Sequence, residues 1–370
     1  MKILVFTLLI VLSWGAPSRA EIRPSFSLEY SAWHATDIVG ATEGDAIDGK
    51  LRILETWKGD LPVGAEISIP ELARFAPADA RRVADNIFSP KNPGPQTVTG
   101  AKMVLFLTRT TEPKTLWKAA SRGEEFSTAV VWMEDQLLYS FVQEINPGPS
   151  QLEYLRQSNS DFFMQLQDVL QSQYGLTEAT TIADKVGQSW ALGVYANSKY
   201  YDARKTAFAR LSANGAAALP VLRQLIAQSE RAPVADQVRP QVFFDVGEAI
   251  PALGQAGGAS VGPELTAMVR DEIRFWRQAA PTLKVGWWNG AGQSDAPIEP
   301  LRRRYSKLLM ALYALSKIKD ARSRSAVVEL RDFWRSRPQL NDPSGLNQMI
   351  EASDAVLKAL DTPATLPTKR

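Results

Sequence analysis

Apolar residues between positions 202 and 228 recur at helical spacing in two short segments that meet at a tight corner. The first series leads to Leu211 and stops at Gly215, because glycine tolerates the left-handed conformation of a helix C-terminus. The second series starts beside Pro220, a residue tolerated in the first turn of a helix. We therefore predict a helical hairpin with one apolar side, which similar neighbours must cover.

The hairpin pattern recurs along the second half of the chain. Leu211 aligns with Leu253 at an offset of 42 residues, with Leu315 62 residues further on, and with Leu357 after another 42. We interpret the stretch 278–300, which lacks helical periodicity, as an inserted loop that lengthens the middle interval. A period in the low forties built of paired helices is typical of HEAT-like solenoids, and an ordinary helical bundle is the alternative.

The first half of the chain instead alternates apolar and polar positions with a period of two. Leu51 and Ile53 alternate with Lys50 and Arg52, which is typical of a half-buried strand. The predicted strands are 36–39, 50–57, 65–69, 103–107, 115–119, 128–133 and 136–142. Because 103–107 is apolar throughout, we expect it to be covered on both faces. Short strands at this density predict a compact antiparallel barrel or sandwich.

These two patterns predict an α+β multidomain chain, in which a small antiparallel β-barrel precedes a HEAT-like α-solenoid. The barrel is expected at 21–146, with 71–99 as a long surface insert. Asn146-Pro147-Gly148-Pro149 cannot continue a strand ladder, so we place the domain boundary there. Helices are expected over 147–362, the first of them starting at Gln151, and 363–370 is expected to form a disordered tail.

The first twenty residues predict a secretory signal peptide. Lys2 supplies the basic start, residues 3–14 supply a short apolar core, and Ser18 and Ala20 are the small residues at the cleavage site. An uncleaved membrane anchor is the alternative, but Gly15 interrupts the apolar run before the length that a spanning helix needs. We expect export to the periplasm or the extracellular space, with no transmembrane segment after cleavage.

Charge and cysteine content narrow the function further. The formal net charge is +2, and removing residues 1–20 brings it to zero, which argues against general nucleic-acid binding. The chain has no cysteine, which suits an oxidising compartment and excludes disulfides, thiolate metal sites and a cysteine-linked lipid anchor.

Both halves resemble known families. The pattern from Leu211 to Leu225, and its echo from Leu253 to Leu265, resembles HEAT repeats, which implies a curved surface that binds other molecules. The first half resembles the netrin-type or TIMP-like five-stranded barrel of secreted proteins, an OB-type barrel. That resemblance rests on Asp37-Ile38-Val39, Leu51 to Gly59, Glu66 to Ile69 and Gly100 to Leu107. The inhibitors of that family use a disulfide-bonded N-terminal cysteine, so protease inhibition is not implied here.

Candidate catalytic chemistry is sparse. His34 is the only histidine, which makes a site with two histidine ligands impossible, and we interpret it as a residue at the edge of the barrel. Glu43, Asp45 and Asp48 could offer oxygen ligands to calcium, but their spacing fits no loop motif and suits a solvated hairpin. We predict no catalytic residue, no metal and no cofactor.

Two surface features are the candidate binding residues. The segment 301–337 contains eleven basic and three acidic residues, a local charge excess of +8. This excess indicates either a solvated helix face or a docking patch for an acidic partner or an anionic surface. The other feature is a tryptophan pair in the inserted loop, which either packs onto the helices or forms a binding edge. The predicted binding residues are Trp287, Trp288, Arg302, Arg303, Arg304, Arg322, Arg324, Arg331 and Arg335.

The first functional hypothesis is a non-catalytic, exported interaction or scaffold protein of the cell envelope. Its expected partner is another envelope or secreted protein or an anionic surface, and not a nucleic acid. The alternatives are an envelope hydrolase that uses carboxylates or His34, and a cysteine-free barrel that inhibits a secreted enzyme.

Overall fold

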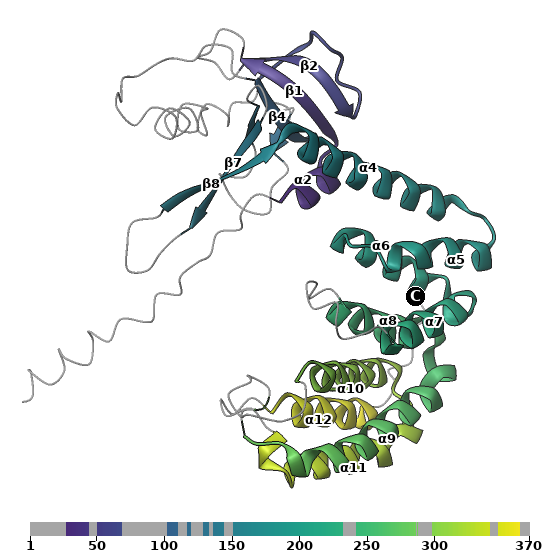
Figure 1. Ribbon diagram of the computed structural model, residues 1–370. Coiled ribbons are helices and arrows are strands. Elements are labelled where there is room, and N and C mark those ends of the chain that lie inside the picture. Colours follow the sequence, from purple (N-terminus) through teal and green to yellow (C-terminus); the bar gives the residue numbers. More distant parts are fainter. Residues whose placement is uncertain are drawn as a thin grey trace, which may run out of the picture. The chain divides into compact units, whose positions relative to one another are not determined.

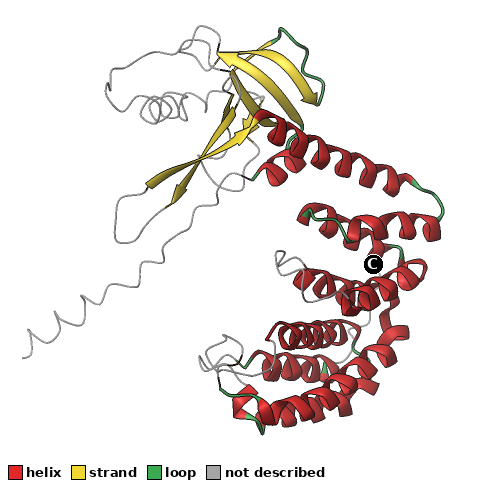
Figure 2. Cartoon of the chain, in the orientation of Figure 1, coloured by secondary structure: helices red, strands yellow, loops and turns green. Residues whose placement is uncertain are grey.

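The computed structural model divides into two compact units, residues 1–171 and 172–370. It describes residues 27–43, 50–68, 102–109, 117–119, 129–132, 136–143, 151–231, 242–285, 287, 298–340 and 347–362. The first unit contains an antiparallel sheet and the second contains packed helices, which confirms the α+β class with the β part first (Figures 1 and 2). The predicted signal peptide, the predicted insert and the predicted tail lie outside the described residues.

The sheet contains eight strands in the described part of the chain. Their order is β3-β2-β1-β4-β6-β7-β8, and β5 also pairs with β4. The strands are β1 (Asp37–Glu43), β2 (Lys50–Lys58), β3 (Glu66–Ser68), β4 (Lys102–Arg109), β5 (Trp117–Ala119), β6 (Ala129–Trp132), β7 (Gln136–Gln143) and β8 (Gln151–Ser158). Because no pairing joins β3 to β8 in the described ladder, closure into a barrel stays a prediction.

Alternation along the strands builds the core of this unit. In β2, Leu51 and Ile53 are buried while Lys50 and Arg52 are exposed. β4 is apolar on both faces, with Met103 to Leu107 all at most 2% exposed, as the sequence predicted. The core cluster combines Val39, Ala41, Leu51, Ile53, Ile67, Met103, Leu105 and Leu107.

Strand β8 corrects two predictions, the domain boundary at 146–149 and the helix expected to start at Gln151. This strand pairs with β7 from Gln143↔Gln151 to Gln136↔Ser158, so the Pro-Gly-Pro segment connects two paired strands and does not end the sheet. The helix expected from Gln151 begins instead at Asn159, as α4 (Asn159–Thr181), which runs from the first unit into the second.

The helices of the second unit form two rows. The first row contains α6 (Tyr201–Ala213), α8 (Val242–Gly257), α10 (Ile298–Ile318) and α12 (Gln348–Asp361), each packed on the next. The other row contains α5 (Lys185–Ala196), α7 (Leu219–Arg231), α9 (Gly262–Ala279) and α11 (Arg324–Arg335). Each of these helices packs on the member of the first row that follows it in the chain (Figure 1).

The leucines that were aligned in the sequence occupy equivalent places in this arrangement. Leu211, Leu253, Leu315 and Leu357 lie on α6, α8, α10 and α12, and all four are buried. The first three of these helices end at similar corners, made by the 3₁₀ helices η2 (Gly215–Ala218), η3 (Gly258–Val261) and η6 (Ala321–Ser323). A residue with positive φ precedes or opens each corner: Gly215, Gly258 and Lys319.

Candidate functional site

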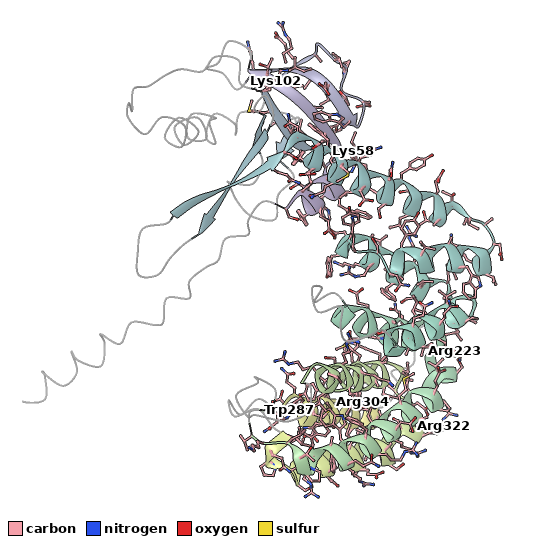
Figure 3. The ribbon with its side chains drawn as sticks, viewed as in Figure 1. Lys58, Lys102, Arg223, Trp287, Arg304 and Arg322 are labelled. Carbon is pink, nitrogen blue, oxygen red and sulfur yellow. The ribbon has the colours of Figure 1, made fainter. Side chains whose placement is uncertain are left out.

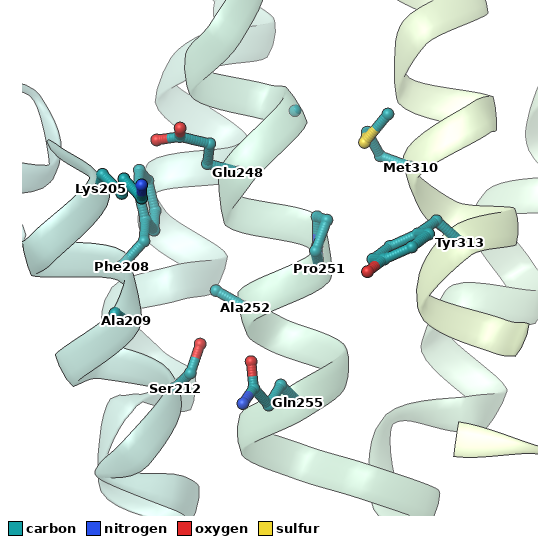
Figure 4. Close-up of a pocket in the computed structure, with 11 residues that line it drawn as sticks. Lys205, Phe208, Ala209, Ser212, Glu248, Pro251, Ala252, Gln255, Met310 and Tyr313 are labelled. Atoms are coloured by element: carbon teal, nitrogen blue, oxygen red, sulfur yellow. The ribbon is translucent and has the colours of Figure 1, made fainter. Parts of the chain in front are cut away.

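A groove of about 460 Å³ crosses α6, α8 and α10 on the first row of helices (Figure 4). On α6 it is lined by Lys205, Phe208, Ala209 and Ser212, whose spacing places them on one helical face. On α10 it is lined by Met310 and Tyr313, which lie one turn apart. Its volume is in the range of small-ligand and peptide-segment sites.

Small residues on α8 create the hollow. Gly247, Pro251 and Ala252 face the groove between the larger side chains of α6 and α10. An added Cβ at Gly247 would lie 4.0 Å from Cγ of Met310, which is an ordinary contact, so this position has room that the sequence leaves unfilled. The floor of the groove therefore exists because α8 carries no long apolar side chain there.

Pro251 adds a polar feature to this apolar floor. It lies inside α8, and proline has no N–H to donate to the carbonyl four residues earlier. That carbonyl belongs to Gly247, which also lines the groove. The helix therefore lacks one internal hydrogen bond, between residues 247 and 251, beside the floor of the groove.

The two ends of the groove differ in chemistry. Lys205 and Glu248 lie at one end, and Ser212 and Gln255 lie at the other (Figure 4). Between them, Phe208, Pro251 and Tyr313 supply apolar surface, and the side chain of Tyr313 is 52% exposed. The arrangement suits a short segment that is apolar in its middle and polar at its ends.

A second cluster of polar residues surrounds Asp37 in the sheet unit. The Asp37 side chain is fully buried, and Arg109 donates to both of its oxygens, Nη2 to Oδ1 at 3.0 Å and Nε to Oδ2 at 3.1 Å. Thr36 Oγ1 donates to Oδ2 at 2.8 Å, and the backbone N–H of Asp60 donates to Oδ1 at 3.3 Å. Because both carboxylate oxygens are occupied and shielded from water, Asp37 holds β1, β4 and the β2–β3 turn together.

Lys58 joins the helix α2 (Leu28–His34) to this cluster. Its Nζ donates to the carbonyl of Ala32 at 2.9 Å, near the C-terminus of α2. Burial lowers the pKa of Lys58 from 10.5 to about 8, and the nearby charge of Asp37 acts in the opposite direction. The hydrogen bond to Asp37 raises the pKa of Arg109, which keeps this partner charged.

The predicted tryptophan site has a structural role at the position that can be described. Trp287 is 1% exposed, and its ring centroid lies 5.4 Å from that of Trp276 and 6.2 Å from that of Tyr305. Trp276 in turn packs edge to face with Trp334, with ring centroids 5.3 Å apart. Trp287 therefore packs onto the helices and is not an exposed binding edge; Trp288 lies outside the described residues.

Arg304 pairs with a buried acid from another helix. Its Nη1 lies 3.0 Å from Oε1 of Glu272 on α9, and its guanidinium lies 3.9 Å above the ring of Phe275. Glu272 is 1% exposed, and burial raises its pKa although Arg304 and Lys307 act to lower it. This predicted binding residue is thus engaged within the fold (Figure 3).

The other paired arginines of the predicted basic segment also have acidic neighbours. Arg322 Nε lies 2.8 Å from Oδ1 of Asp320, and its Nη2 donates to the carbonyl of Ala259 at 3.0 Å, which links η6 to η3. Hydrogen bonds from Arg322 lower the pKa of Asp320. On α11, Arg331 and Arg335 pair with Asp354 and Arg324 pairs with Asp361, both acids being on α12.

These ion pairs offset part of the +8 charge excess counted over 301–337 in the sequence. Glu272, Asp354 and Asp361 lie outside the segment 301–337, but the fold brings them beside its arginines. Arg302 and Arg303 lie on α10 and are half-buried. Docking of an anionic partner on this segment stays a prediction.

The remaining candidates do not assemble into a metal or catalytic site in the described part of the chain. His34 ends α2, not a strand, and its exposed ring lies 4.1 Å from that of Tyr30. Glu43 ends β1, while Asp45 and Asp48 lie outside the described residues. Within those residues there is no group of three or more histidine, cysteine or acidic side chains arranged to hold a metal. No described helix has the length and apolar character needed to cross a membrane.

Comparison with known protein families, with curated proteins and with solved structures gives no match for this chain.

The groove was missed at the level of sequence. Gly247 and Pro251 fall in a helical segment that we used only for the repeat alignment through Leu253. A proline and a glycine four residues apart inside a predicted helix were the available signal, because both are rare there unless packing or function requires them.

Proposed function

We propose that the helical unit is a non-catalytic binding module that holds a short apolar segment of another protein in the α6–α8–α10 groove. The observation that carries this proposal is a hollow made by small residues on α8, between the aromatic side chains of Phe208 and Tyr313. An apolar hollow that opens to solvent offers surface against which a ligand can pack.

The chemistry of the groove sets the expected ligand. Removing roughly 300 Å² of apolar surface from water contributes about 7 kcal/mol, and association and ordering offset much of this gain. We therefore expect extended peptides that bind with a Kd on the order of 10 μM.

The repeat-like arrangement supports a binding role. Stacked helical hairpins resemble a HEAT-like solenoid, and such arrays offer broad surfaces to partners. The N-terminal signal pattern and the cysteine-free composition support a partner in the periplasm or outside the cell, which we propose is an envelope or secreted protein. We also propose that the sheet unit is a netrin-like domain of the same exported binding protein.

The test uses peptides selected from a displayed library of random twelve-residue sequences on the immobilised full chain. Fluorescence anisotropy then compares wild type with Gly247→Leu, which fills the groove and improves the helix propensity of α8. We expect binding to weaken at least tenfold. Arg210→Leu is the control, because Arg210 is exposed on α6 and its position faces away from the groove lining.

The control should bind as wild type does. Equal binding to all three proteins would place the site elsewhere, and failure to recover any peptide that binds above background would contradict the proposed function.

A further inference from the structure

Helix α5 reverses the usual distribution of apolar and polar residues. Val186, Trp190 and Val194 are 51%, 47% and 70% exposed, while Gln188 and Ser189 are buried. The three apolar residues lie four positions apart, so they form one stripe along the helix. Exposed apolar stripes of this kind mark interaction surfaces.

The orientation of α5 is fixed by its buried side. Gln188 Nε2 donates to the carbonyls of Thr180 at 2.7 Å and Ile182 at 3.0 Å. Ser189 Oγ accepts from Asn214 Nδ2 at 3.0 Å and donates to the carbonyl of Lys185 at 2.7 Å. Turning the helix to bury its stripe would break the bonds to Thr180, Ile182 and Asn214, so the stripe stays exposed.

The contact with α7 constrains the same helix by shape. A Cβ at Gly193 would lie 2.7 Å from Cγ1 of Val221, closer than real Cβ atoms approach. Only glycine lets α5 lie this close to α7. Gly193 lies two turns from Val186, at the edge of the stripe, so the stripe belongs to a closely packed helix and not to a loose one.

We propose that α5 packs against α5 of a second copy of this chain, antiparallel, about a two-fold axis at Trp190. Trp190 lies midway between Val186 and Val194, so the stripe reads Val-Trp-Val in both directions. An antiparallel two-fold pairing places Val186 of one copy on Val194 of the other and each Trp190 on its equivalent. A two-fold interface requires a self-complementary surface of this kind.

The low charge of α5 favours a second copy of the chain over a lipid surface, and the small exposed area of the stripe limits the affinity of the dimer. The one charged residue of α5 is Lys185, at its N-terminal end, so no like charges meet at the axis. A lone lysine is also far short of the basic face with which amphipathic helices bind membranes. The stripe exposes on the order of 300 Å², less than the roughly 800 Å² per partner of a stable interface. The dimer should therefore be weak and concentration-dependent.

Cysteine cross-linking tests the geometry, because the chain has no thiol of its own. In the antiparallel dimer, two copies of residue 186 lie roughly 12 Å apart along the helix axis, beyond disulfide reach. Val186→Cys or Val194→Cys alone should not cross-link under mild oxidation, whereas a mixture of the two full-length variants should give the mixed dimer. Self-cross-linking of each variant, or no mixed dimer, would overturn the proposal.

Sedimentation equilibrium tests the same surface without cysteine. Val285→Lys is the control, because it alters an apolar side chain that is 57% exposed elsewhere in the helical unit. Wild type and this control should both dimerise at high micromolar concentration. Trp190→Lys should stay monomeric with an unchanged melting temperature. A wild-type monomer throughout, or flotation of wild type with phosphatidylglycerol vesicles that Trp190→Lys abolishes, would show that a second copy is not the occupant.

Discussion

Single residues decide the local structure around Asp37. Gly59 has φ of 88°, and a Cβ at this position would collide with Oδ1 of Asp37. The glycine therefore permits the close approach of the turn to the carboxylate that Arg109 pairs with. The sequence predicted strands at 36–39 and 50–57, but it could not show that Asp37 and Arg109 meet, because they are 72 positions apart.

Lys58 gives this cluster a measurable pH dependence. Its pKa is about 8 in the folded chain and near 10.5 in the unfolded chain, so between these pH values the unfolded chain binds a proton that the folded chain has released. Stability attributable to Lys58 should therefore rise from pH 8 to 10.5 and stay constant below this range. Urea unfolding of wild type and Lys58→Met at pH 7, 8.5 and 10 measures the difference.

The other lysines and tyrosines titrate in both proteins, so the difference isolates Lys58. The gap in unfolding free energy should shift in favour of wild type as the pH rises. A gap that is the same at all three pH values would contradict the buried environment of this ammonium group.

Helices and strands could be predicted where the apolar residues of a segment fitted only one type of spacing. The strands from β1 to β7 were predicted, β2 from its alternation and β4 from its continuous apolar run. In contrast, β8 was mistaken for a helix because Leu152 and Leu155 continue a helical spacing toward Phe162. Pairing with β7 decided the outcome, and such tertiary pairing overrides local pattern. The groove was equally hidden, because it requires three helices from distant parts of the chain to lie side by side.

The helix corners provide a test at this scale. Gly258 has φ of 53°, and an added Cβ would meet nothing within 4 Å. Gly258→Ala should therefore destabilise the helical unit by about 1 kcal/mol through backbone strain alone. Lys319 has the same φ of 53° without being glycine, so Lys319→Gly should stabilise by about 0.5 kcal/mol.

Urea unfolding followed by circular dichroism at 222 nm measures both variants. Opposite signs at the two corners are expected. If both substitutions left the stability unchanged, the left-handed geometry of these corners would be contradicted.

At the scale of the whole molecule, charge counted along the sequence differs from charge arranged in space. The segment 301–337 carries an excess of +8 in the sequence. Acids from α9 and α12 lie beside its arginines in the fold and offset part of this positive charge. The groove, which carries both signs and an apolar floor, is therefore the stronger candidate for partner binding.

The most direct test of this account is hydrogen exchange of the full chain, measured by mass spectrometry with and without the tightest peptide from the library. We predict slower exchange on binding in α6, α8 and α10, with their groove-facing segments 205–212 and 247–255 most affected. Protection confined to the sheet unit or to α11 and α12, with the groove helices unchanged, would contradict it.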